Sequence, residues 1–150
     1  MKVISNILSG VSGEYFVSAE LSRRGYIASL TSKNTKGIDI LASNEDASKT
    51  VGIQVKTNQG SVKSWILTKS SQEYQSANLF YVFVNLREKE TPEYHIVPSS
   101  YVAKYITENH NTWLQTPGKK GNTHNDTNIR SFSDKNNEYL NRWDILGLDQ

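Results

Sequence analysis

The stretch VGIQVK at residues 51–56 is short, rich in β-branched residues and bounded by turn-forming residues, which is typical of a buried strand. Side chains alternate between the two faces of a strand, so Gln54 and Lys56 share one face. The valines and the isoleucine around them share the other. This stretch therefore predicts a strand with one apolar face and one face able to carry a polar cluster.

A second strand is predicted at residues 37–42 (GIDILA), where Asp39 stands between apolar residues. If the two strands form a hairpin, Asp39 lies beside Gln54 and Lys56 near one strand end. Strands disfavour aspartate, and a buried carboxylate costs several kcal/mol unless it is paired or bound to a metal. Two interpretations stay open: Asp39 and Lys56 form a structural ion pair, or the three polar residues build a metal site.

The elements around this pair indicate an α/β protein. We expect a helix at residues 13–24, capped by Ser12, on which Glu14 falls on the packed side with Val17 and Leu21. A glutamate in a first helical turn also favours the helix dipole without any active site. The other predicted elements are strands at 26–31, 60–68, 79–84 and 92–97, a weak helix at 69–77, and a helix at 99–108 capped by Ser99 or Ser100.

Residues 109–137 are rich in asparagine and poor in apolar residues, which predicts a long ordered loop or appendage. Beyond it, Tyr139, Leu140, Trp143 and Leu146 have a helix-like spacing that indicates a tail docking back on the core. No linker divides the chain. We therefore expect one domain over residues 1–150, with a core at about 10–97 and a C-terminal helix and appendage at about 98–150.

The composition excludes several classes of protein. The 150 residues contain no cysteine, so disulfide frameworks, thiolate zinc sites and cysteine nucleophiles are ruled out. No apolar stretch is long enough for a membrane span, and the N-terminus lacks the pattern of a signal peptide, so we expect a cytoplasmic protein. The net charge of +2 permits nucleic-acid binding without arguing for it, since a phosphate footprint needs a local cluster of positive charge.

A carboxylate beside a lysine suits the hydrolysis of phosphodiesters. Mg²⁺ prefers hard oxygen ligands and keeps several of its waters, and a carboxylate such as that of Asp39 can anchor it. The ammonium of Lys56 can stabilise negative charge developing on the phosphate, or help to lower the pKa of an attacking water. Glu14 is a candidate for a further carboxylate at the same place.

These residues resemble the core of the PD-(D/E)XK nucleases, in a layout similar to that of archaeal Holliday-junction resolvases and Mrr-type restriction enzymes. The resemblance spans residues 10–85 and rests on these elements in order: Gly10 and Glu14, Gly25-Tyr26, Ser32-Lys33, Ile38-Asp39-Ile40-Leu41-Ala42 and Ile53-Gln54-Val55-Lys56. It implies an αβββαβ core whose central mixed sheet is flanked by helices, a Mg²⁺ or Mn²⁺ cofactor, DNA as partner and a homodimer.

The resemblance also implies a role for each motif position. Glu14 matches the glutamate of the family's first helix, and Asp39 its metal-binding aspartate. Gln54 matches the second acidic ligand, Val55 the carbonyl ligand, and Lys56 the catalytic lysine. The second acidic position is a glutamine here, as in Mrr-type enzymes. Its neutral oxygen can still bind a hard cation, but with one charge less of attraction, so metal affinity should fall.

Four lysines are the candidate contacts to nucleic acid: Lys33, Lys36, Lys119 and Lys120. The first two lie in the loop that enters the Asp39 strand, and the last two stand beside glycines in the asparagine-rich segment. Scattered surface charge is the plainer explanation of all four.

Three functions remain open from the sequence. The first is a metal-dependent endonuclease that hydrolyses DNA. The second is a non-catalytic nucleic-acid-binding module that keeps the nuclease fold. The third is an interaction protein in which Asp39 and Lys56 form only a structural pair. The sequence does not decide between DNA and RNA.

Overall fold

The computed structural model describes residues 3–32 and 35–149 and contains a five-stranded mixed sheet. Its strand order is β1-β2-β3-β5-β6, and only β3 and β5 run parallel to each other. The strands of this sheet are β1 (Ile27–Leu30), β2 (Ile40–Ser43), β3 (Thr50–Asn58), β5 (Leu79–Asn85) and β6 (Glu93–Pro98). The other elements are α1 (Asn6–Arg23), β4 (Ser64–Thr68), the 3₁₀ helix η1 (Lys69–Gln72), α2 (Ser99–Gln115), β7 (Ile129–Ser133) and the 3₁₀ helix η2 (Trp143–Leu146).

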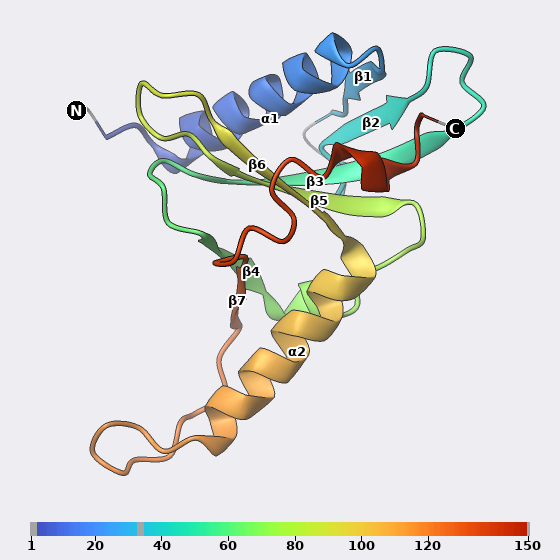
Figure 1. The fold of residues 1–150 in the computed structure, drawn as a ribbon. Coiled ribbons are helices and arrows are strands. Elements are labelled where there is room, and N and C mark those ends of the chain that lie inside the picture. Colours follow the sequence, from blue (N-terminus) through green and yellow to red (C-terminus); the bar gives the residue numbers. More distant parts are fainter. Residues whose placement is uncertain (1–2, 33–34, 150) are drawn as a thin grey trace.

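Other elements cover both faces of the sheet (Figure 1), and each face carries its own apolar cluster. On one face, α1 and the C-terminal tail pack on Ile53, Val55 and their neighbours. On the other face, α2 and the small sheet of β4 and β7 pack on Tyr81 and Phe83. All seven residues of β5 are buried, as expected of an interior strand covered on both faces.

Helix α1 begins earlier than the sequence indicates. Its N-cap is Ser5, whose hydroxyl accepts from the Leu8 N–H at 3.2 Å, so the predicted start at residue 13 with Ser12 as cap was wrong. Gly13 lies inside the continuous helix, at a point where a side chain would collide with Thr57 of β3. Glu14 consequently lies in the middle of α1 rather than in its first turn.

The C-terminal half differs more from the prediction. Helix α2 continues to Gln115. Its first residue, Ser99, does not cap it, because the Ser99 hydroxyl bonds to the backbone N–H and carbonyl of Ser76. The predicted loop at 109–137 therefore holds the last turns of α2 and the strand β7, and within this range residues 116–128 and 134–137 lie outside helices and strands. The predicted helix at 69–77 is reduced to the single turn of η1.

The tail docks on the core as predicted. Backbone bonds join Tyr139 and Asn141 to β6, and Trp143 and Leu146 are buried in the cluster beneath α1. Within the described residues, none of the helices combines the length and apolar character that crossing a membrane requires.

Candidate active site

Asp39 lies directly before β2, at the point where β2 and β3 part. Its N–H donates to the Ile53 carbonyl at 2.9 Å, and its own carbonyl accepts from the Thr31 N–H at 3.0 Å. Hydrogen bonds on both sides thus fix the backbone of Asp39, and with it the position from which its side chain extends.

The carboxylate of Asp39 reaches across the gap where β2 no longer pairs with β3. Its Oδ2 accepts from the Val55 N–H at 2.7 Å. The Ile53 carbonyl already points toward Asp39, and backbone groups two residues apart along a strand point to the same side. The Val55 carbonyl therefore faces the same gap, beside the carboxylate.

Gln54 and Lys56 of β3 are the other polar residues of the site. They pair in register with Tyr81 and Phe83, so their side chains stand on the face that α2 covers, while Val55 faces α1. Both are half-buried and line a cavity of about 340 Å³. The predicted hairpin and the shared face of these two side chains are confirmed.

Burial raises the pKa of the Asp39 carboxyl, and the Val55 N–H and the positive charge of Lys56 oppose that rise. Lys56 is thus near enough to act on Asp39 through its charge. Among the ion pairs within 4.0 Å in the described part of the chain, however, none joins these two residues. The geometry does not favour the interpretation of Asp39 and Lys56 as a closed structural pair.

The cavity has a second wall that the sequence did not reveal. Tyr74 packs over Gly37, whose φ of +74° suits glycine and where an added Cβ would lie 2.5 Å from the tyrosine ring. The Tyr74 hydroxyl donates to the Gly37 carbonyl. Burial, as the largest cause, raises the pKa of Tyr74 to about 12, so the hydroxyl stays a neutral donor and fixes the loop that carries Lys36.

Further polar residues from η1 and its flanks complete this wall. They are Thr68, Ser70, Ser71 and Glu73. No periodicity marks residues 68–74, so sequence reasoning had no signal by which to assign them to the site. These residues line the same cavity as Gln54 and Lys56.

Glu14 approaches from the opposite side. It is half-buried on α1, next to Gly13, which touches Thr57 of β3. Because α1 covers the face that Val55 presents, the structure does not place Glu14 on the same face as Gln54 and Lys56. Its part in metal binding stays a prediction.

The predicted nucleic-acid contacts divide into two places. Lys36 is exposed at the rim of the cavity, whereas Lys119 and Lys120 stand on the loop 116–128, beyond the end of α2. Lys33 lies outside the described residues. Arg130, a further basic residue of the segment, is buried and bonds to the Gln72 side chain, so it is a structural residue.

The oxygen donors of the site are those that Mg²⁺ and Mn²⁺ accept: one carboxylate, one side-chain amide and one backbone carbonyl. Within residues 3–32 and 35–149, no group of three or more acidic, histidine or cysteine side chains is placed to hold a metal. Gln54 stands where a second carboxylate would complete a stronger site.

No family model and no curated protein matches the sequence, but solved structures match the fold. A bacterial homing endonuclease, I-Ssp6803I, has a TM-score of 0.52 over 96% of this chain and 92% of that chain, at 10% identity. The Holliday junction resolvase Hjc of the archaeal hyperthermophile Archaeoglobus fulgidus has a TM-score of 0.47 over 83% of this chain and 84% of that chain, at 13% identity. The match to the homing endonuclease covers nearly the full length of both chains. This chain therefore has the restriction-endonuclease-like fold that the resemblance to PD-(D/E)XK nucleases implied.

Proposed function

We propose that this protein is a metal-dependent endonuclease that hydrolyses phosphodiester bonds of DNA. The observation that carries the proposal is the gap between β2 and β3. The Asp39 carboxylate reaches into this gap and the Val55 carbonyl faces it. Gln54 and Lys56 line the adjoining cavity. The fold shared with a bacterial homing endonuclease supports a nuclease activity.

In this proposal Asp39, Gln54 and Val55 would hold Mg²⁺ or Mn²⁺. The ion would supply Lewis-acid stabilisation of charge on the phosphate. Asp39 must be ionised to bind it, and the Val55 N–H keeps one carboxylate oxygen in place. Lys56 helps to lower the pKa of the attacking water, which gives up a proton to solvent, or stabilises negative charge as the water oxygen bonds to phosphorus. One P–O bond breaks, and the leaving oxygen takes up a proton from solvent. Glu14 is proposed as an additional carboxylate, and Lys33 and Lys36 as contacts to the DNA backbone.

Cleavage of plasmid and branched DNA with Mg²⁺ or Mn²⁺ tests the proposal. Asp39→Ala and Lys56→Ala should each abolish most cutting, because one removes the metal anchor and the other the positive charge beside the phosphate. Both variants must still melt cooperatively. Cutting that survives both substitutions would contradict the assignment of the site.

The second candidate is a nucleic-acid-binding module without catalysis. Gln54 favours it, because the glutamine leaves the site with one charge less to attract a divalent ion. This candidate expects DNA binding that weakens with salt, and no cutting. Filter binding carried out beside the cleavage assay separates the two functions. A homodimer is likewise a proposal, which sedimentation analysis tests directly.

A further inference from the structure

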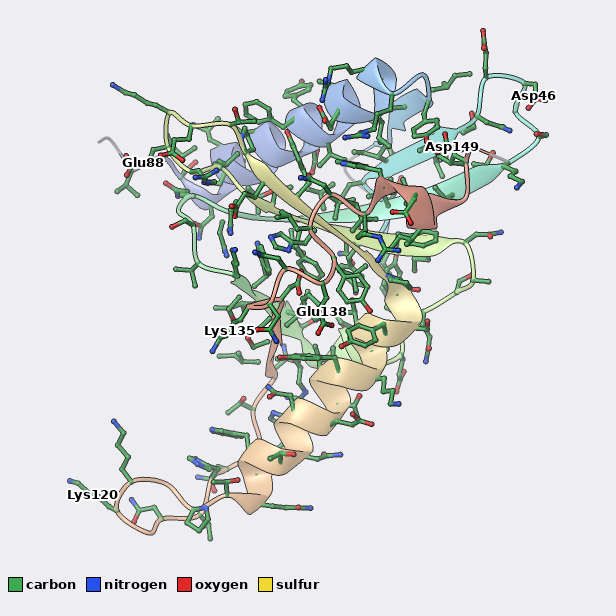
Figure 2. The ribbon with its side chains drawn as sticks, viewed as in Figure 1. Asp46, Glu88, Lys120, Lys135, Glu138 and Asp149 are labelled. Atoms are coloured by element: carbon green, nitrogen blue, oxygen red, sulfur yellow. The ribbon has the colours of Figure 1, made fainter. Side chains whose placement is uncertain are left out.

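Residues 109–128 project from the body of the protein and are here called the arm. They comprise the last turns of α2 and the loop that follows, and Figure 1 shows them reaching away from the central sheet. Lys120 lies at the far end of this loop (Figure 2). The sheet does not need such an extension, since both of its faces are already covered.

The base of the arm is held by stacked rings. The Trp113 indole stacks on the His124 ring with centroids 4.1 Å apart, and on the His110 ring at 5.4 Å. The His110 Nε2 lies 2.8 Å from Asp126 Oδ1. These contacts join the returning part of the loop to α2, so the loop is held against the helix.

The tip of the arm is a tight turn that presents two lysines. The Gly118 N–H donates to the Asn122 carbonyl at 2.8 Å, and Gly121 has a φ of +76°, which closes the turn between them. Lys119 and Lys120 occupy the exposed part of this turn. A hydrogen-bonded turn thus exposes two positive charges to solvent.

The positive charge of the tip is not balanced within the arm. Asp126 is the arm's single acidic residue, and it stands at the base, where it contacts His110 and lies 3.7 Å from Arg130. The remaining arm residues are mostly asparagine, threonine and glycine, which offer hydrogen-bond donors without negative charge. This surface favours contact with a phosphate backbone.

The arm is rooted on the wall of the candidate active site. The Gln72 amide in η1 donates to Thr107 of α2 at 2.8 Å, and its oxygen accepts from Arg130 of β7 at 2.9 Å. The Lys69 N–H donates to the Asn128 carbonyl at 3.0 Å. The same η1 segment lines the cavity that holds Gln54 and Lys56, so the arm and the site are parts of one surface.

The arm extends on the side of the sheet that carries the polar site residues. Helix α2 covers the face of Tyr81 and Phe83, which is also the face of Gln54 and Lys56. From Thr107 to Gln115 the helix advances by about 12 Å, and the loop adds to that reach. A turn of duplex DNA is about 34 Å long, so the tip lies roughly half a turn or more from a phosphate bound at the site.

We propose that the arm is a second contact for duplex DNA, which binds the backbone of the flank on one side of the cleaved bond through Lys119 and Lys120. Lys36 lies at the cavity and Lys69 at the root of the arm, so each contact has a further lysine beside it. The proposal rests on the proposed function for the bond that is cut, but the binding itself needs neither metal nor catalysis.

The test is the affinity of the full chain for duplexes of increasing length, measured by fluorescence anisotropy in EDTA. Affinity should rise severalfold once the duplex spans about one helical turn and so reaches the tip. The double variant Lys119→Ala/Lys120→Ala should lose this gain. It should also lower the slope of log K against log salt by about two, one for each lost phosphate contact.

The matched control is Lys49→Ala/Lys89→Ala, which removes the same charge from the segments that contain Asp46 and Glu88, and Figure 2 shows both of these acidic residues far from the arm. It should keep the length dependence. If the arm variant binds as the control does, the inference is overturned whether or not the protein cuts DNA. If the arm variant loses the gain but the parent chain never cuts, the inference stands and the catalytic proposal falls.

Discussion

Asp39 must be ionised for the proposed chemistry, yet its surroundings favour the neutral form. Burial raises the pKa of its carboxyl, and the Val55 N–H and the Lys56 charge offset this only in part. The folded protein therefore holds this proton more tightly than the unfolded chain does. As the pH rises from the unfolded value of about 3.9 through the raised pKa of the folded state, stability falls.

We predict that Asp39→Asn melts at a higher temperature than the parent chain at neutral pH in EDTA. The amide has no charge to desolvate, and its oxygen can still accept from the Val55 N–H. The advantage should shrink as the pH falls, and vanish below the unfolded pKa of Asp39, where the carboxyl is protonated in both states. Thermal unfolding across this range measures it.

Asp46→Asn is the control for that experiment. Hydrogen bonds from Ser48 lower the pKa of Asp46, so the same substitution there should bring no gain at neutral pH. An Asp39→Asn variant that melts at or below the parent temperature at neutral pH would show that Asp39 is a stabilising structural residue instead.

Gln54 sets the strength of the proposed metal site. Gln54→Glu adds a carboxylate beside that of Asp39, so we predict that the dissociation constant for Mn²⁺ falls at least tenfold. A tenfold fall corresponds to about 1.4 kcal/mol of binding free energy. Isothermal titration measures the constant. Gln115→Glu, which adds the same charge at the end of α2, should leave it unchanged. Equal affinity in the parent and in Gln54→Glu would remove Gln54 from the site.

The central part of the site could be predicted from the sequence because strand alternation is a short-range rule. It places Gln54 and Lys56 on one face, and the hairpin brings Asp39 beside them. Tyr74 could not be found in this way. Its role depends on a long-range contact with Gly37, in a segment without periodicity.

Among the elements, α1 and β3 approach each other closely at one glycine. A Cβ at Gly13 would lie 1.9 Å from the Thr57 hydroxyl, whereas a Cβ at Gly10 meets nothing within 4 Å. We predict that Gly13→Ala destabilises the protein by about 1–3 kcal/mol through overpacking. Gly10→Ala, in the same helix, should stabilise it by about 0.5–1 kcal/mol.

Urea unfolding of both alanine variants measures these changes. Thr57→Ala combined with Gly13→Ala should recover part of the loss, because it removes the hydroxyl and the methyl group that the new Cβ meets. If Gly13→Ala is as stable as Gly10→Ala, then α1 does not lie against β3 at this position.

The element boundaries that sequence reasoning missed have one cause in common. Strand β7 buries Arg130 and Phe132 on one face, and a buried arginine gives no apolar signal. The last turns of α2 likewise carry polar residues and end in the stacked rings of the arm. Tertiary contacts, rather than local pattern, decide these boundaries.

At the scale of the whole molecule, the two faces of the sheet differ in what covers them. The face under α1 is closed by the C-terminal tail, and Trp143 packs there against Tyr94 with centroids 5.4 Å apart. The opposite face carries the cavity, η1 and the arm. A ligand at the site therefore contacts residues from several elements that only the folded chain brings together.

An ion that binds only the folded protein must raise the stability of the whole chain. At tenfold excess over its dissociation constant, Mn²⁺ should raise the melting temperature by about 3–6 °C. Asp39→Ala should abolish this rise, because the Asp39 carboxylate is the proposed anchor of the ion. Asp46→Ala, in an exposed turn, should retain it. A rise of the same size in Asp39→Ala would place the ion elsewhere, and no rise in the parent chain would favour the function without a metal.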